Sequence, residues 1–301
     1  MKYSGIGGQA VMEGIMMKNK DSYAVAVRKP DKKIIVETFE YKGILNYSIL
    51  KKTPFLRGVF SFIDSLVLGM KTLTFSASFF EEEEETVKED PLKKAKKEKV
   101  EMGATVALSI VLAIVVFMLM PYYASLLFVK ISSSLTILAL IEGLIRLTVF
   151  IGYVAAISFI PDIKRVYMYH GAEHKCINCI EHGNDLTVEN VRKSSRLHKR
   201  CGTSFLIVVM IITIFVFAFI RVDSHILRVV LRLVLIPVIA GISYEFIRLA
   251  GTKDNLAINL LSAPGLLLQK ITTQEPDDTM IEVGIASVEA VFDWKKFLEE
   301  P

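Results

Sequence analysis

The chain has 301 residues, of which 52% are hydrophobic, with a mean hydropathy of +0.45 and a formal net charge of +4. This composition is too apolar for an ordinary water-soluble protein and indicates segments that cross a lipid bilayer. The basic excess is small and no DNA- or RNA-reading motif occurs, so nucleic acid is excluded as an expected partner.

The N-terminal region, residues 1–43, is expected to be cytosolic and to contain β-structure. Its glycine-rich stretch 5–14 lacks the lysine of a phosphate-binding loop, and we interpret it as a turn-rich lead-in; the alternative is that Gln9 and Glu13 reach a functional site. Residues 23–28 and 33–39 alternate between apolar and polar side chains, which predicts two strands.

Residues 44–80 are interpreted as an amphipathic helix that lies in the membrane interface or packs on the transmembrane bundle. The apolar pattern is interrupted by Arg57, Asp64 and Lys71, and a charge at the centre of a bilayer costs about 3 kcal/mol. A true span is the alternative, and it would invert the topology downstream. Residues 81–102 form a charged linker whose basic part can contact anionic lipid headgroups.

Two transmembrane hairpins are predicted, 103–160 and 204–250. Their four apolar segments are each long enough to cross about 30 Å of hydrocarbon. The connection 161–203 is rich in Lys and Arg, so the positive-inside rule puts this segment and both termini in the cytoplasm of a bacterial cell, with the spans in the inner membrane. The ionisable residues within the predicted spans include Glu142, Arg146, Glu245 and Arg248.

The C-terminal region, residues 251–301, is expected to be cytosolic. Pro264-Gly265 is interpreted as a helix breaker, and residues 280–286 alternate like a strand that could join the N-terminal sheet. The predicted fold is therefore a mainly α integral membrane protein. It combines a four-helix transmembrane bundle and an amphipathic interfacial helix with a small cytosolic α+β part built from the termini and 161–203.

Potential chemistry is concentrated in 161–203. This segment holds four of the five histidines and all three cysteines, namely His170, His174, His182, His198, Cys176, Cys179 and Cys201. The first two histidines belong to an H-x-x-E-H pattern at 170–174. On a helix they lie one turn apart on one face, where both can reach one metal ion.

Two ligand sets are compatible with this segment, and a third interpretation has no metal, with the histidines paired to carboxylates and the Lys and Arg side chains in contact with lipid phosphates. In a catalytic set, His170 and His174 bind Zn²⁺ or another divalent cation, His198 or Cys201 adds a third ligand, and a water takes the open position. Glu173 is then the general base, and Glu181 or Glu189 is a further ligand or orients a histidine. In a structural set, Cys176, Cys179, His198 and Cys201 fill a zinc tetrahedron and leave no open position.

Several blocks together resemble the YqhQ-like family of bacterial membrane proteins, a domain-of-unknown-function family often labelled as predicted metal-dependent enzymes. The resemblance implies a multi-pass membrane protein with a metal site, and it carries Glu13 and Glu275 over as further candidate polar residues beside His170, Glu173, His174, His198 and Cys201. Cys176 lies outside the family pattern, which weakens the structural set. The matching blocks are GGQAVMEG (7–14), YHGAEHK (169–175), LTVENVRKSSRLHKRCGTSF (186–205), AGISYE (240–245) and TTQEPDD (272–278).

The leading hypothesis is an integral membrane metal-dependent hydrolase with its site at the cytoplasmic face and a peptide or a lipid-linked ester as substrate. One alternative is a membrane scaffold or adaptor in which a structural metal site fixes the cytosolic part. Another is a transporter or lipid carrier that uses the Glu and Arg residues of the spans.

Overall fold

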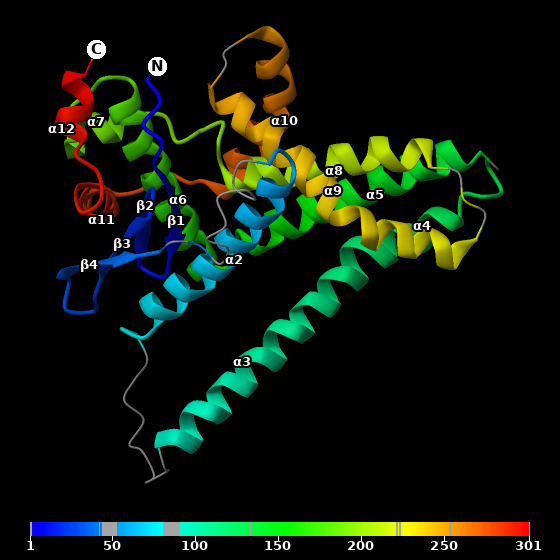
Figure 1. Cartoon of the computed structure of the whole chain (residues 1–301), viewed down its shortest axis with the longest axis horizontal. Coiled ribbons are helices and arrows are strands. Elements are labelled where there is room, and N and C mark those ends of the chain that lie inside the picture. Colours follow the sequence, from blue (N-terminus) through cyan, green and yellow to red (C-terminus); the bar gives the residue numbers. More distant parts are fainter. Residues whose placement is uncertain are drawn as a thin grey trace. The chain divides into compact units, whose positions relative to one another are not determined.

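A computed structural model of the chain describes residues 2–41, 43, 53–80, 91–132, 134–220, 222, 224–252 and 255–300. The described part is mainly helical and contains one small sheet (Figure 1). The chain divides into two compact units. One comprises Met1–Phe80, Val154–Ile212 and Ser224–Pro301, and the other comprises Glu81–Tyr153 and Thr213–Asp223. The first part of the predicted charged linker, 81–90, lies outside the described residues.

The sheet has four antiparallel strands that follow one another in chain order. The strands predicted over 23–28 and 33–39 are confirmed, whereas the glycine-rich stretch 5–14 is not a lead-in but forms the first strand and the hairpin after it. Glu13 adopts a φ of 48° at the hairpin turn, a conformation that short connections between antiparallel strands require. The strands are β1 (Gly7–Val11), β2 (Gly14–Asn19), β3 (Ser22–Arg28) and β4 (Ile34–Glu40).

Both faces of the sheet are covered by helices (Figure 1). Because side chains alternate along a strand, Ile15 and Met17 point to one face and Met16 points to the other. The first face packs against α6 (Pro161–Glu181) and α11 (Asp278–Glu289). The second packs against the C-terminal half of α2 (Leu56–Ala77), which supplies Leu68 and Phe75.

Helix α11 replaces the strand that was expected over 280–286. Asp277 caps its first turn by accepting a hydrogen bond from the backbone N–H of Met280. Its buried residues Met280, Val283, Gly284 and Ser287 recur with helical spacing. Seven residues were too few to separate this period from strand alternation. The prediction of a strand over 280–286 was therefore wrong, and α11 covers the sheet instead of extending it.

Five helical segments among the described residues are long and apolar enough to cross a membrane. Four of them correspond to the predicted spans, and α2 is the fifth. The four are Val100–Leu126, made from α3 (Pro91–Ile114), the π-helical turn η1 (Val115–Leu119) and α4 (Met120–Leu126), then α5 (Leu135–Ile157), α8 (Gly202–Phe219) and α9 (His225–Thr252). These helices indicate a membrane protein.

Three shorter helices complete the described fold: α7 (Val188–Lys193), α10 (Leu256–Thr272) and α12 (Trp294–Glu299). Pro264-Gly265 was expected to interrupt a helix, but both residues lie inside α10. Gly265 is buried against Ser204 of α8, and a Cβ there would lie 2.6 Å from the Ser204 hydroxyl oxygen. Pro264 removes one backbone hydrogen bond of α10, and Gly265 lets the helix pack closely on α8 at the next residue.

Two ion pairs involve charged residues of the apolar helices. Glu142 and Arg146 form an ion pair of 2.5 Å within α5, where their spacing of four residues puts both on one face of the helix. Glu245 of α9 pairs with Arg57 of α2, a partner that the sequence did not identify. The interruption of the α2 pattern by Arg57 is therefore matched by a carboxylate on a neighbouring helix.

Candidate metal centre

Helix α6 carries the H-x-x-E-H pattern on its buried half. It begins at Pro161, whose missing N–H is not needed in the first turn. Residues 171–181 are buried, and the apolar ones among them pack in the core with the sheet and α11, whereas His170 is partly exposed. The helical spacing assumed for His170 and His174 is confirmed, and their ring centroids lie 4.5 Å apart.

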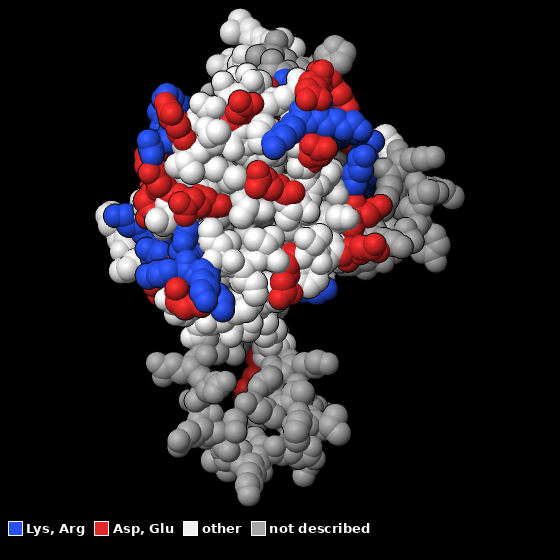
Figure 2. Space-filling view, turned by 90° about the vertical axis from the view of Figure 1, so that its left-hand side faces the viewer, with Lys and Arg blue, Asp and Glu red and all other residues white. Residues whose placement is uncertain are grey.

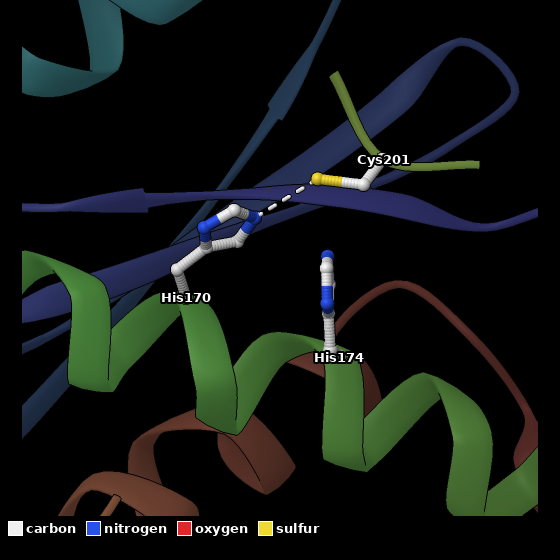
Figure 3. A group of neighbouring side chains, drawn as sticks. All are labelled: His170, His174 and Cys201. Atoms are coloured by element: carbon white, nitrogen blue, oxygen red, sulfur yellow. Dashed lines mark hydrogen bonds between the residues drawn. The ribbon is translucent and has the colours of Figure 1, made fainter. Parts of the chain in front are cut away.

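Cys201 joins the two histidines to form a compact group (Figure 3). The ligand atoms of His170, His174 and Cys201 all lie within 4.8 Å of one another. Nε2 of His170 lies 3.2 Å from Sγ of Cys201, which immediately precedes α8. Within the part of the chain that the structure describes, this is the group of His, Cys, Asp and Glu side chains that could hold a metal ion.

Backbone carbonyls orient both imidazoles. The Nδ1 atom of His170 lies 2.9 Å from the carbonyl oxygen of Thr272, and Nδ1 of His174 lies 2.7 Å from that of Arg196. Since a carbonyl oxygen can only accept a hydrogen bond, each Nδ1 carries the proton and donates it. Metal-binding histidines commonly donate their second ring N–H in this way, which leaves Nε2 available as the ligand.

The charges of the group favour a cation between them. Burial raises the pKa of the Cys201 thiol, but the imidazoles of His170 and His174 lower that pKa well below its usual range. Burial lowers the pKa of His170, yet the sulfur of Cys201 and the carboxylate of Glu173 raise it to about 9. The thiolate thus faces positive charge, which either an imidazolium proton or a metal cation can supply.

Glu173 lies between the two imidazoles. Its Oε2 atom is 3.9 Å from Nε2 of His170 and 3.9 Å from Nε2 of His174. Strand β1 passes directly over this side chain at Gly8, where a Cβ would lie 2.7 Å from Cγ of Glu173. Gly8 of the N-terminal block is therefore needed for steric reasons, because a side chain there would collide with that of Glu173.

His198 lies beside this group in a separate polar network. Its ring centroid is 5.7 Å from that of His174, and its Nε2 is 3.4 Å from the carboxylate of Glu181. Glu181 also pairs with Arg200 and accepts hydrogen bonds from the backbone and hydroxyl of Ser4. Burial raises the pKa of Glu181, but His198, Ser4 and Arg200 lower it to about 2. The network fixes the loop that leads to Cys201.

The remaining acidic candidates lie outside the group. Glu13 pairs with Arg165 and accepts from the hydroxyl of Tyr169 at 3.2 Å. Glu189 pairs with Lys193 on the surface. Glu275 lies 2.9 Å from the buried ammonium of Lys175 and 3.5 Å from Arg196.

Cys176 and Cys179 are not gathered with His198 and Cys201. Both thiols belong to the hydrophobic core between α6, α11 and the sheet. Cys176 faces Gly284 of α11, and burial raises the pKa of both thiols. Among the described residues, the structural set of three cysteines and one histidine is therefore not assembled.

Some positioning groups carried no recognisable sequence signal. Gln269 of α10 accepts from the backbone N–H of His198 at 2.8 Å and donates to the carbonyl of the same residue at 2.8 Å. Gly171 allows the backbone of Gln274 to cross α6, because a Cβ there would lie 2.0 Å from that carbonyl oxygen. A contact made by a main-chain carbonyl, such as that of Thr272, does not depend on the type of side chain, so the sequence does not reveal it. The residues that make these contacts nevertheless lie in the blocks 169–175 and 272–278.

Comparison with known proteins identifies the family. A family model described as "Protein of unknown function (DUF1385)" matches residues 53–294. The chain is 40% identical over 286 residues to the "Uncharacterized protein YqhQ" of Bacillus subtilis (strain 168), which covers 93% of this chain and 90% of that protein. No solved structure matches. The resemblance to YqhQ-like proteins is thus confirmed, and the chain belongs to the DUF1385 family of proteins of unknown function.

Proposed function

We propose that the protein is an integral membrane, metal-dependent hydrolase. His170, His174 and Cys201 would hold Zn²⁺ or another divalent cation, and Glu173 would be the general base. One observation carries this proposal: the Glu173 carboxylate lies 3.9 Å from Nε2 of both histidines, so it adjoins the ligand atoms of the candidate site.

The donor set fits such an ion. Two imidazole nitrogens and one thiolate are typical zinc ligands, and three protein ligands leave a fourth position for water or substrate. The hydrogen bonds from Nδ1 of His170 and His174 to carbonyl oxygens support the same interpretation. Cys201 takes the place of the third ligand, for which the sequence had also offered His198.

The chain's own residues would handle the proton. When bound, the cation supplies Lewis acidity, which polarises a carbonyl group and lowers the pKa of water. The carboxylate of Glu173 would accept the proton of the attacking water and return it to the leaving group. The backbone hydrogen bonds of His170 and His174 would keep both rings in register with that carboxylate during turnover.

The membrane topology of the proposal is supported by the shared core. The sheet and α6 pack together, so an even number of membrane crossings must separate them. The helix 100–126 and α5 provide two, and a crossing by α2 would make three. This supports four crossings with α2 at the membrane surface. Helices α8 and α9 then return the chain to the same side, where α11 packs on the sheet.

We place this side in the cytoplasm of a bacterial cell because the connection 161–203 is rich in Lys and Arg. Cys201 directly precedes α8, so the site would stand at the end of a span. A substrate held near the membrane surface, either a peptide segment or a lipid-linked ester, suits this position.

The first experiment is metal analysis of the purified full-length protein and of four variants. We expect about one divalent ion per chain in the wild type and in Glu173→Gln, because a three-ligand zinc site does not need that carboxylate. His174→Ala and Cys201→Ala should lose the ion. Cys176→Ser is the matched cysteine control and should retain it. Loss of metal in Cys176→Ser together with retention in His174→Ala would contradict the proposed ligand set.

The second experiment tests for an open coordination position. The protein is loaded with Co²⁺, and its visible absorption spectrum is followed while azide or a hydroxamate is added. A hydrolase site should bind the added ligand and change the spectrum. Glu173→Gln should give the same response and abolish metal-dependent turnover of ester and peptide substrates by the protein in nanodiscs.

A non-enzymatic membrane scaffold with a structural ion is the second candidate. It is favoured by burial, because Glu173 is 5% exposed, His174 2% and Cys201 6%. In this case the Co²⁺ spectrum should not respond to added ligands. Removal of the metal should instead lower the thermal stability of the protein, and Glu173→Gln should change stability without changing any turnover.

A further inference from the structure

The exposed side of helix α10 is mainly leucine, and its buried side combines Ile258 and Leu268 with several polar residues. Its outward side chains include Leu256, Leu260, Leu261 and Leu267, which are 85%, 71%, 56% and 60% exposed. Its buried residues include Ser262, Gly265, Gln269 and Thr272. A helix on a water-facing surface has the opposite arrangement. The outer face of α10 is therefore suited to apolar surroundings.

Contacts with α8 and the short connection from α9 place α10 beside the ends of two apolar helices. Gly265 packs against Ser204, and Gln269 donates to the hydroxyl of Ser204 at 2.7 Å. Ser204 belongs to the first turn of α8. At its other end, α10 begins at Leu256, shortly after α9 ends at Thr252. If α8 and α9 cross the bilayer, α10 lies where both of them leave it.

The length and edges of α10 fit a helix that lies along the membrane surface. Its 17 residues span about 25 Å, which is less than the hydrocarbon thickness of about 30 Å. Asn259 accepts a hydrogen bond from Lys199 at 2.7 Å, and Lys270 is exposed. Cationic side chains at the polar edge of an apolar face are typical of interfacial helices.

We propose that α10 is a second in-plane membrane helix, whose leucine face docks into the boundary between lipid headgroups and acyl chains. The occupant of this face is the bilayer itself, since the helix is fixed beside the ends of two candidate spans. This proposal rests on the membrane part of the proposed function and is independent of the metal chemistry.

The same helix carries groups that hold the candidate metal centre. The carbonyl of Thr272 accepts the Nδ1–H of His170, and Gln269 binds the backbone of His198 in the loop that leads to Cys201. A lipid-bound α10 would therefore set the position of both ligand-bearing segments from the membrane side.

Tryptophan fluorescence in nanodiscs tests this placement. The chain has a single tryptophan, Trp294, so Trp294→Phe gives a background into which one reporter can be introduced. Leu260→Trp reports on α10, Val234→Trp on the exposed face of α9, and Val36→Trp on the exposed face of β4. Each full-length protein is placed in nanodiscs of phosphatidylcholine whose acyl chains are either brominated, near the headgroup and deeper in the chain, or not brominated.

We expect brominated lipid to quench Leu260→Trp strongly, as it quenches Val234→Trp, with emission shifted to shorter wavelength. Val36→Trp should keep its intensity. Leu267→Trp repeats the test on the same face in case the first variant does not fold. If both α10 reporters are quenched no more than Val36→Trp, then water or a second copy covers the face and the proposal is overturned. Because the readout needs no metal, this outcome is separable from failure of the hydrolase proposal.

Discussion

Two regions of the molecule are folded by opposite rules. In the layer formed by the sheet, α6 and α11, apolar side chains such as Ile15 and Ile180 are fully buried. Acidic and basic side chains stand side by side on its surface, as Figure 2 shows and as the Arg28–Glu282 pair illustrates. In the apolar helices the large side chains point outward instead, including Phe215 and Val234, which are 62% and 60% exposed. This difference is the one expected of a membrane protein, in which one region faces water and the other faces lipid.

The candidate metal centre lies where these two regions meet. His170 and His174 come from the buried helix of the sheet-containing layer, whereas Cys201 is the last residue before the apolar helix α8. The three side chains therefore converge only if both regions are folded and correctly joined. The comparison can be tested by substitutions in the two regions.

The largest effect is expected for Glu181→Gln in the sheet-containing layer. Removing one partner of a buried ion pair costs about 3–5 kcal/mol, and Arg200 would lose its carboxylate. Because the pKa of Glu181 falls from 4.5 to about 2 on folding, its contribution to stability is present above pH 4.5 and is lost as the pH falls toward 2.

The measurement is the free energy of unfolding as a function of pH, with Trp294 as the fluorescent reporter because it packs on the core of this layer. The variant should be less stable at neutral pH and should have a flatter acid limb than the wild type. Equal acid dependence in both proteins would show that Glu181 is not held in its charged form.

The second-largest effect is expected when a valine is replaced by aspartate on the surface of an apolar helix, compared with the same replacement on the surface of the sheet. Val234→Asp on α9 should lower stability by about 3 kcal/mol, the cost of a carboxylate in the middle of a membrane helix. Val36→Asp on β4, a matched exposed valine in the sheet, should change it by about 0.5 kcal/mol. Both are measured by denaturant titration in lipid nanodiscs. Similar costs at both sites would mean that the two surfaces face the same solvent.

The smallest effect is expected at the Arg28–Glu282 pair, whose oxygen and nitrogen lie 2.7 Å apart. Glu282 is half exposed, so Glu282→Gln should cost less than about 1 kcal/mol, and added salt should reduce that cost further. Thermal unfolding at low and high ionic strength checks this. A cost that is large and independent of salt would show that this side of the layer is shielded from water.

Much of the architecture could be predicted from the spacing of apolar residues along the chain. Apolar residues recur over enough positions to identify strands β3 and β4 and the four long apolar helices. The first two strands were missed because their glycines resemble a loop, although Gly8 is required by the side chain of Glu173 beneath it. Such a requirement depends on a contact between residues far apart in the chain, which no local pattern records.

The candidate site was also only partly predictable. The helical spacing of His170 and His174 follows from the sequence, and Cys201 was one of two candidates for a third ligand. The choice between His198 and Cys201 depends on the path of the loop between α7 and α8. That path is set by Gln269 and by the carboxylate of Glu181, neither of which is near in sequence.

The contact between α11 and the sheet has a consequence for the order of folding. The hydroxyl of Ser287 donates to the carbonyl of Ile15 at 3.0 Å, across a sequence separation of 272 residues. The hairpins of the sheet are local and can form early, but their apolar face is covered only after nearly the whole chain has been synthesised. Until then Ile15 and Met17 lack one of their two covering helices, so α11 covers this face of the sheet only late in synthesis.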